Sequence, residues 1–525
     1  MYRDEFPPLV RFTLWAGLLA LTIILRYPAT PHEIGWDTFS IHALANSISE
    51  FGWARWWVHP LSIGGFYPGS YASSVPFLVS GISQCTGIDT EWTIWLFCTL
   101  IGIFTVFFAY ILAGAIKDND LFKFLVAFGY SVAPGLLALT TWGLSSRGLF
   151  IVLLPLFIYL LLKTHNSLKY LPFAIILFMV LALTHHLFYF TILSLLSYIV
   201  VVIFYKLKGH IKIKIPDFAS STFLFGIFII ILSIPFFTRI FISETGTRYY
   251  WYTLTLGTHV RMVGILLLFA ISGFIYILLK HDKTFVEWFL LLFLIFLTPF
   301  IPILRYTKYF DIILATLFVG IGLENVAKVY NRRAKYVFTI IVIVMLLSVS
   351  FSGFYQHYHT NIVGRPTYNE RYMEESTYVG ALWIKNNIDK DKVMVDNNGY
   401  DLLIGRRIFA ISEVLTLTGD SVTDLTYGLT NITEINITKN SPLTKEFYMD
   451  NPYVRTPMTP YTGFYRSMLN SVEFDSRWGK LIISKFNLSV VIENEDIGDN
   501  VFTRSVHREK NNVYANGKIS LWLLD

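Results

Sequence analysis

Two carboxylates stand near the start of the chain, in the stretch His32-Glu33-Ile34-Gly35-Trp36-Asp37. The stretch directly follows the first hydrophobic segment, residues 9–27, so it lies where the chain would leave a lipid bilayer. A carboxylate at such a boundary can take a proton from a hydroxyl group or ligate a metal ion. We expect Asp37, with Glu33 as its neighbour, to carry the chemistry. The alternative is that Asp37 is a solvated loop residue or the N-cap of a following helix.

Cations that follow two later apolar segments could bind a phosphate group. Arg305 has the most favourable position, Lys308 is close to it in sequence, and Arg147 stands at a comparable boundary. A guanidinium offers a planar fork of donors that matches phosphate oxygens. The alternative is that these cations only anchor helix ends at the membrane surface, with Asp311 pairing with Lys308 or Arg305.

The adjacent histidines His185 and His186 lie at the end of another apolar segment. Imidazole is a frequent metal ligand, so both join Asp37 as candidates for holding a metal ion. Neighbours on a helix point about 100° apart, so only one histidine would easily face a given ion. The alternative is that both are hydrogen-bonded boundary residues.

The composition is that of a membrane protein: 54% of the residues are hydrophobic and only 15% are charged. The net charge of +6 is modest and its lysines and arginines cluster in short loops, which argues against a nucleic-acid partner. Hydropathy predicts about eleven transmembrane helices. They are expected at residues 9–27, 93–116, 124–139, 148–162, 170–183, 187–205, 218–237, 260–279, 285–304, 309–326 and 336–351.

Loop charges orient these spans. Alternate loops are rich in lysine and arginine, which predicts that they and the N-terminus lie inside. Residues 355–525 then form a domain on the outside of a multi-pass cell-membrane protein, following a transmembrane domain over residues 1–354. Charge and Asn content rise beyond Tyr355, and the pattern predicts a small α/β domain with a helix at 376–388 and strands at 392–395, 488–493 and 519–523.

The first external loop, residues 28–91, is unusually long. Ile41, Leu44 and Ile48 recur at helical spacing, and the polar-interrupted segment 71–88 is expected to lie in the interface or re-enter the membrane. The neighbouring tryptophans suit the headgroup zone of a membrane, and they are Trp53, Trp56 and Trp57.

These features together resemble the polyprenyl-phosphate-dependent glycosyltransferases of the GT-C fold. The protein O-mannosyltransferases, the aminoarabinose transferases and the catalytic subunit of oligosaccharyltransferase are members. The resemblance rests on an outward carboxylate after the first span, the loop segment 66–71, an arginine after a further outer boundary and a cation at a late one. It implies that Asp37 serves as base or metal ligand, with Mg²⁺ or Mn²⁺ as the divalent metal, and that Arg305, Lys308 and Arg147 bind the donor phosphate.

The resemblance also implies a substrate loop over residues 239–259, which the family often uses as a mobile lid. Arg248, Tyr249 and Trp251, together with Tyr67 of the first loop, would contact the sugar. An aromatic belt at the membrane surface has the same sequence pattern.

The expected function is transfer of a sugar from a polyprenyl-phosphate donor to a glycan, lipid or protein acceptor on the outer membrane face. Protein N-glycosylation, as by oligosaccharyltransferase, is an alternative. The family's Trp-Trp-Asp-Tyr-Gly acceptor motif lies where residues 396–401 read Asp-Asn-Asn-Gly-Tyr-Asp, without either tryptophan. A transporter or flippase for lipid-linked saccharides and a non-catalytic membrane scaffold are the alternatives of other classes.

Overall fold

The computed structural model describes residues 5–210, 225–231, 233, 248–301, 306–329, 334–355, 373–396, 402–418, 421–430, 437–439, 453–455, 461–494 and 498–524. The chain divides into two compact units. The helical unit comprises Met1–Tyr27, Cys98–Thr141 and Arg147–Thr360, and the α/β unit comprises Pro28–Phe97, Trp142–Ser146 and Asn361–Asp525. The first external loop therefore clusters with the C-terminal residues.

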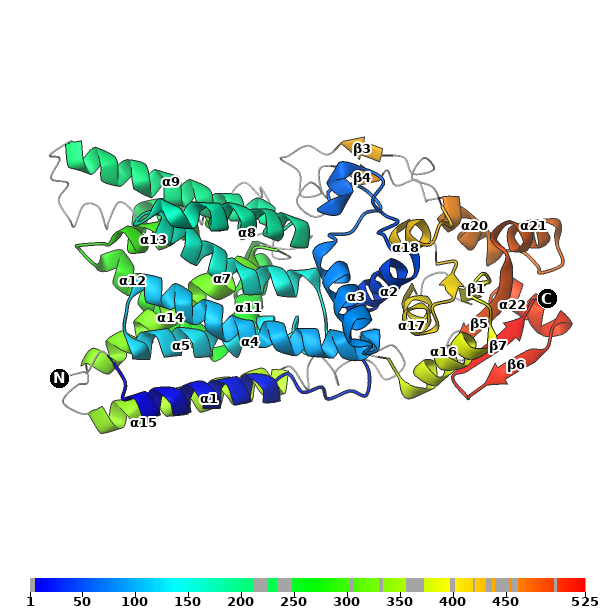
Figure 1. Ribbon diagram of the computed structural model, residues 1–525, viewed down its shortest axis with the longest axis horizontal. Helices are drawn as coiled ribbons and strands as arrows, with labels where there is room; N and C mark the ends of the chain where they lie inside the picture. The colour runs from blue at the N-terminus through cyan, green and yellow to red at the C-terminus, as the bar shows by residue number, and fades with distance from the viewer. Residues whose placement is uncertain are drawn as a thin grey trace. The chain divides into compact units, whose positions relative to one another are not determined.

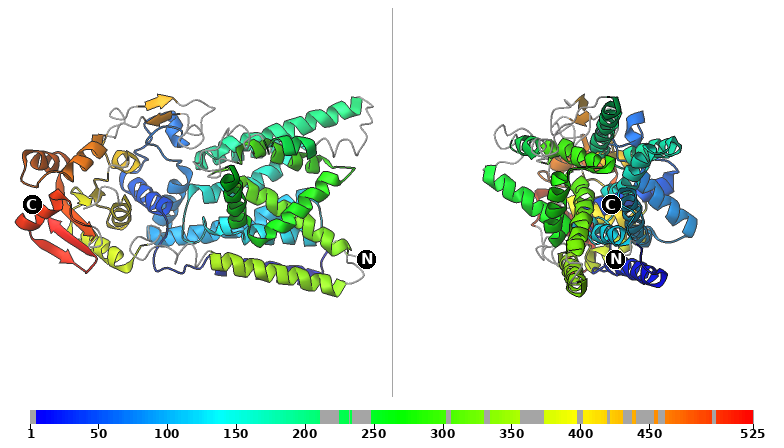
Figure 2. Two further views of the ribbon diagram at one scale, coloured as in Figure 1. Left: turned by 180° about the vertical axis from the view of Figure 1, so that it is seen from behind. Right: turned by 90° about the vertical axis from the view of Figure 1, so that its left-hand side faces the viewer.

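The helical unit is built from apolar helices that run side by side (Figures 1 and 2). Five helical stretches are long and apolar enough to cross a membrane: Thr90–Ile116, Ser146–Thr164, Phe188–Leu207, Tyr252–Leu279 and Lys308–Ala327. Shorter apolar helices cover Pro8–Ile24, Leu168–Thr184, Phe285–Phe300 and Phe338–Phe354. The predicted class of polytopic helical membrane protein is confirmed. The helices are α1 (Pro8–Ile24), α4 (Thr90–Ile116), α5 (Asp120–Ser131), α6 (Pro134–Leu137), α7 (Ser146–Thr164), α8 (Leu171–Thr184), α9 (Phe188–His210), α11 (Arg248–Val263), α12 (Leu267–Leu279), α13 (Phe285–Leu297), α14 (Lys308–Val329) and α15 (Ala334–Phe354).

Two predicted segments differ from the observed helices. The segment expected over residues 124–139 is interrupted, because Pro134 cannot continue α5 and instead starts the short helix α6. The helix expected from residue 260 begins earlier, at Arg248, and changes to a 3₁₀ turn at Gly264, whose φ of 77° suits glycine. The span predicted over 218–237 lies mostly outside the described residues.

Glycines allow close packing between α12 and α14. A Cβ atom added at Gly273 would overlap the carbonyl oxygen of Phe318, and one added at Gly322 would overlap that of Phe269. Small residues at such contacts let the backbones of two membrane helices approach closely.

The α/β unit contains a five-stranded sheet of order β2-β1-β5-β7-β6. β1 pairs in parallel with β2 and β5, whereas β7 pairs antiparallel with β5 and β6. The strands expected at 392–395, 488–493 and 519–523 are confirmed to within one residue, as is the helix at 376–388, which is α16 (Glu375–Asn387). The strands are β1 (Val393–Asp396), β2 (Leu415–Thr416), β5 (Leu488–Asn494), β6 (Asn512–Ala515) and β7 (Ile519–Leu523), and β3 (Ile437–Lys439) and β4 (Tyr453–Arg455) pair separately.

Side chains that alternate along the strands belong to two apolar cores, one on each face of the sheet. On one face Met394, Val490 and Ile492 join α16 and α17 (Leu402–Ser412). On the other face Val395 and Val491 join α20 (Tyr461–Leu469), α21 (Arg477–Phe486) and α22 (Val501–Glu509). The sheet is thus a three-layer arrangement covered by helices on both faces.

The first external loop belongs to the same core. It forms α2 (Trp36–Phe51), a 3₁₀ turn over Pro60–Ile63 and α3 (Ser74–Thr86), and Phe39 of α2 is fully buried in the core on the α16 face. Trp56 is also fully buried, against Leu44, Ile48, Ala54 and Leu425, the last of which belongs to α18 (Ser421–Thr426). The expectation that Trp56 lies in the lipid headgroup zone is therefore wrong, whereas Trp53 is 52% exposed.

Candidate active site

Asp37 lies in the first turn of α2 and is half-buried. The helix is capped by Gly35, whose φ of 99° is accessible to glycine, so Asp37 is not the N-cap and that alternative is wrong. A carboxylate in the first turn is stabilised by the positive end of the helix dipole. Its Oδ2 accepts a 2.6 Å hydrogen bond from the Ser145 hydroxyl.

The segment Trp142–Ser146 holds Ser145 in this position. The Trp142 carbonyl accepts a 3.0 Å hydrogen bond from the backbone N–H of Ile34, and the Leu144 carbonyl accepts one of 3.2 Å from the Thr38 hydroxyl. Trp142 has a φ of 48°, a left-handed conformation that is uncommon for a residue other than glycine. The segment is therefore pinned to the start of α2 from both sides of Asp37.

Glu33 is fully buried and pairs with a histidine that sequence reasoning missed. Its Oε1 lies 2.9 Å from Nδ1 of His42 on α2. Its Oε2 is buried and has no hydrogen-bond partner among the described residues. Burial raises the pKa of Glu33, although His42 opposes the shift. Burial lowers the pKa of His42, but the attraction to the Glu33 carboxylate outweighs that effect and leaves it raised.

A second histidine–carboxylate group ties the patch to the C-terminal residues of the same unit. His32 places Nδ1 3.0 Å from Glu91 and Nε2 3.0 Å from Glu375 of α16. Its ring stacks on Tyr378 with centroids 3.8 Å apart. The backbone N–H of Glu33 also donates to Glu91. These contacts join residues up to 343 positions apart, so no local sequence signal could have found them.

The α/β unit offers Asp37 as a half-buried carboxylate, beside the pair Glu33–His42 and the group His32–Glu91–Glu375. Glu33 and Glu91 are buried and Glu375 is exposed but paired with His32, so Asp37 remains a candidate to accept a proton from a substrate hydroxyl. The residues also fit a divalent cation of the Mg²⁺ or Mn²⁺ class, which prefers oxygen ligands. The observation behind this fit is Oε2 of Glu33, a buried oxygen without a hydrogen-bond partner in the described part of the chain.

In the helical unit two of the predicted phosphate-binding cations share one aromatic ring. Arg147, in the first turn of α7, places Nη1 3.4 Å from the Tyr309 hydroxyl and its guanidinium 6.0 Å from the ring centroid. Lys308, the first residue of α14, places Nζ 5.2 Å from the same centroid. Tyr309 was missed by sequence reasoning, although it follows Lys308 directly. Arg305 lies outside the described residues.

His185 and His186 lie between α8 and α9 with ring centroids 4.1 Å apart. Nδ1 of His185 accepts a 3.0 Å hydrogen bond from the Leu187 N–H. Burial, the neighbouring His186 and the charge of Arg147 hold the pKa of His185 well below its usual range. This lowered pKa favours the neutral imidazole of His185, which is the form that binds metals. The His186 ring packs edge-on against Tyr306 at 4.9 Å.

Asp311 pairs with a residue that the sequence did not suggest. Its Oδ2 lies 2.8 Å from Nε2 of His259 on α11, so its charged partner among the described residues is this histidine and not Lys308. The alternative pair with Arg305 lies outside the described residues. Nδ1 of His259 faces the Thr255 carbonyl at 2.7 Å.

The predicted substrate loop is helical from Arg248 onward. Arg248, Tyr249 and Trp251 occupy the beginning of α11, and their side chains lie outside the described part of the structure, as does the backbone of 239–247. Tyr67 is half-buried, and its ring stacks on His59 with centroids 4.5 Å apart.

Comparison with known proteins places the fold. No family model matches the chain, and no curated protein matches its sequence. A cryo-EM structure of the mycobacterial arabinofuranosyltransferase AftD matches over 100% of this chain and 40% of that chain, at 13% identity and a TM-score of 0.49. A crystal structure of apo ArnT from Cupriavidus metallidurans matches over 98% and 97%, at 11% identity and a TM-score of 0.42.

A mutant of AftD is the match on which the fold assignment rests. It covers 97% of this chain and 41% of that chain, at 12% identity and a TM-score of 0.51. The chain thus spans about two fifths of the length of AftD. It shares its fold with that part of an arabinofuranosyltransferase.

Proposed function

We propose that the protein is a membrane glycosyltransferase that transfers a sugar from a polyprenyl-phosphate donor to a glycan, lipid or protein acceptor on the outer face of the membrane. The observation that carries the proposal is the placement of Asp37. It stands half-buried in the first turn of α2 and is held by Ser145, in the same unit as the pairs His32–Glu91 and Glu33–His42. The fold shared with part of an arabinofuranosyltransferase supports this class of activity.

In the proposed reaction the acceptor hydroxyl attacks the anomeric carbon of the donor sugar. The new glycosidic bond forms as the bond between that carbon and the phosphate oxygen breaks, and the polyprenyl phosphate leaves with the bonding electrons. Asp37 takes the acceptor proton as general base. Phosphate is a good leaving group, so one base suffices and a separate acid is unnecessary.

Charge that develops on the departing phosphate needs cations. Arg147 and Lys308 are the described residues assigned to this role, and Arg305 joins them on sequence grounds. Arg147 offers a planar fork of donors and Lys308 a compact charge. The Tyr309 ring beneath both side chains orients them, through its hydroxyl for Arg147 and its face for Lys308.

A divalent ion would add Lewis-acid stabilisation of phosphate oxygens. Glu33 and Asp37 are the residues of the α/β unit assigned to hold it. In the helical unit His185 and His186 stay separate candidates for binding a metal ion. The chain's own contribution is to keep Glu33 buried, with its second oxygen free of hydrogen bonds from the residues that the structure describes.

The deciding experiment measures transfer from a panel of radiolabelled polyprenyl-phosphate sugars in membranes that contain the wild type, Asp37→Asn or Glu50→Gln. Glu50 lies near the other end of α2 and is exposed, so it is a matched control on the same helix. Loss of a general base should lower the transfer rate about 100- to 10,000-fold in Asp37→Asn. Glu50→Gln should transfer at the wild-type rate.

Each other result overturns part of the proposal. Full activity in folded Asp37→Asn excludes Asp37 as base. Absence of transfer from every donor, with folded wild-type protein in the membrane, favours a transporter or scaffold. A peptide carrying an N-glycosylation sequon as the accepted substrate would identify an oligosaccharyltransferase-like activity.

A further inference from the structure

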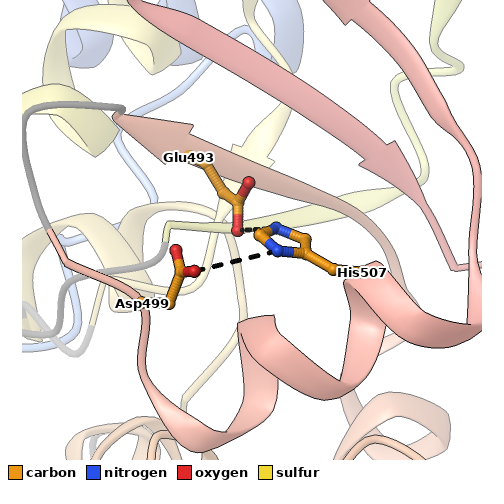
Figure 3. Close-up of side chains that lie close together, drawn as sticks. All are labelled: Glu493, Asp499 and His507. Atoms are coloured by element: carbon orange, nitrogen blue, oxygen red, sulfur yellow. Dashed lines mark hydrogen bonds and ion pairs between the residues drawn. The ribbon is translucent and has the colours of Figure 1, made fainter.

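A histidine and two carboxylates converge in the α/β unit, on elements other than α2, which carries Asp37 (Figure 3). Glu493 comes from the end of β5, Asp499 from the turn before α22, and His507 from the last turn of α22. One ligand atom from each residue lies within 4.8 Å of the other two. This is the one such group of three among the residues that the structure describes.

The individual contacts show how the three residues face each other. Nε2 of His507 lies 2.5 Å from Oε1 of Glu493, and Nδ1 of the same ring lies 3.8 Å from Oδ2 of Asp499 (Figure 3). Glu493 is buried, whereas the Asp499 side chain is 42% exposed. The group therefore has a fixed inner ligand and an outer ligand that is reached from solvent.

Neighbouring side chains hold the inner part in place. The indole N–H of Trp522 on β7 donates a 2.7 Å hydrogen bond to Oε2 of Glu493, which leaves Oε1 pointing at His507. The Trp522 ring also packs on the His507 ring at 4.4 Å. Asn500, the residue after Asp499, is fixed by a capping box with Thr503. Hydrogen bonds of this kind to the far oxygen of a carboxylate are typical of metal ligands.

We propose that Glu493, Asp499 and His507 bind a Zn²⁺ ion. An imidazole with two carboxylates suits Zn²⁺ better than Mg²⁺ or Ca²⁺, which prefer oxygen ligands alone. Ligand bonds to Zn²⁺ of about 2.1 Å place two ligand atoms at most about 4.2 Å apart. The 3.8 Å between Nδ1 of His507 and Oδ2 of Asp499 falls within that limit, and the 42% exposure of the Asp499 side chain leaves it room to adjust.

Three protein ligands leave a fourth position of a tetrahedral ion open to water. The ion would join the end of the central strand β5 to both ends of α22, and so would stabilise the packing of α22 on the sheet. This role goes beyond the proposed sugar transfer and does not depend on it. A protonated His507 bridging the two carboxylates without a metal is the competing explanation of the same geometry.

The test is zinc binding to the full-length protein in detergent, after treatment with a chelator and its removal. Zinc binding is measured by isothermal titration calorimetry and by elemental analysis. The midpoint of thermal unfolding is measured with and without Zn²⁺. The wild type should bind one zinc ion per chain and unfold at a higher temperature with zinc present. Excess Mg²⁺ should not displace the bound zinc.

The variants distinguish the residues that bind the ion directly from the residues that only hold them in place. Asp499→Asn, an exposed change expected to fold, and His507→Gln should each weaken zinc binding at least tenfold. Trp522→Phe removes the donor to Oε2 of Glu493 and should weaken zinc binding about 10- to 100-fold. Glu473→Gln is the control, because it breaks only the exposed 2.9 Å pair with Arg508 on α22.

Two results would overturn the metal site. The first is wild-type protein that binds no zinc and whose unfolding midpoint is unchanged by it. The second is zinc binding that is equally strong in Asp499→Asn and His507→Gln, which would locate the ion elsewhere. If the wild type binds no zinc but His507→Gln still unfolds at a lower temperature than the wild type, the geometry reflects a protonated His507 that bridges the two carboxylates.

Discussion

The hydroxyl of Ser145 donates a 2.6 Å hydrogen bond to Oδ2 of Asp37, across 108 positions of sequence. The contact brings the segment Trp142–Ser146 to the first turn of α2 and sets the orientation of the carboxylate. It links the residue that the sequence singles out for chemistry to one that the sequence leaves unremarked.

Removal of this hydroxyl should impair the reaction through Asp37. Hydrogen bonds to charged groups contribute about 1.5–3 kcal/mol, so Ser145→Ala should lower the transfer rate about 10- to 100-fold. Ser145→Thr keeps a hydroxyl and should retain most of the activity. A double-mutant cycle tests whether Ser145 acts through Asp37. If it does, Ser145→Ala should have almost no further effect on the transfer rate in an Asp37→Asn background. Equal losses in both backgrounds would show that Ser145 acts independently.

Stability should depend on pH through His42. The folded-state pKa of His42 is raised above its ordinary value of 6.5, with burial opposing and Glu33 causing the rise. Protonation of a group whose pKa is raised on folding increases the free energy of unfolding. The whole increase is present below pH 6.5 and is lost as the pH rises through the folded-state pKa.

Glu33→Gln removes the charged partner of His42. The unfolding temperature of the variant should therefore fall furthest below that of the wild type near pH 6, and the difference should shrink toward pH 8.5. Thermal unfolding of the purified protein across this range measures it, with Glu50→Gln as a control expected to show a small, constant offset. If the unfolding temperature of Glu33→Gln instead falls further below that of the wild type as the pH rises, the charged pair Glu33–His42 is not the cause.

Donor affinity should depend on Arg147. Loss of its guanidinium should weaken binding of a polyprenyl phosphate about tenfold, equivalent to about 1.4 kcal/mol. Arg147→Lys should recover only part of this loss, since lysine lacks the planar fork.

Binding of polyprenyl phosphate in detergent, at low and high salt, measures the effect. Lys163→Ala, at the opposite end of α7, is the matched control. If Arg147→Ala binds the lipid as tightly as Lys163→Ala does at both salt concentrations, Arg147 is only a helix-end anchor.

The helical unit should not tolerate a side chain at Gly102. A Cβ atom there would overlap the side chain of Arg26, which is fully buried and donates hydrogen bonds to the Thr140 hydroxyl and the carbonyls of Thr22 and Ser131. Overpacking of this kind costs about 1–3 kcal/mol, so Gly102→Ala should lower the unfolding temperature.

Gly17→Ala on α1 is the control for the helix itself, because nothing lies within 4 Å of a Cβ atom at that position. It should leave the unfolding temperature unchanged or raise it, since alanine favours helix more than glycine does. Equal unfolding temperatures for the two variants would show that Arg26 can move aside.

The apolar helices, the strands β5 and β7 and the position of Asp37 near a helix start were all predictable from the sequence, because each depends on residues close together in the chain. Hydrophobic length predicts a membrane helix, and runs of apolar residues predict a buried strand. The same local reasoning missed the break at Pro134 and misjudged Trp56, whose indole is buried in the α/β unit.

Tertiary structure alone decided which charged groups meet. Glu33 with His42, His32 with Glu91 and Glu375, and Asp311 with His259 come together because the helices and loops that carry them pack against each other. A side chain's type shows what it can bind, but its partner depends on contacts between distant segments. The sequence by itself therefore determined the membrane helices and the candidate acid, whereas the folded chain decided the orientation of that acid and the partners of its buried neighbours.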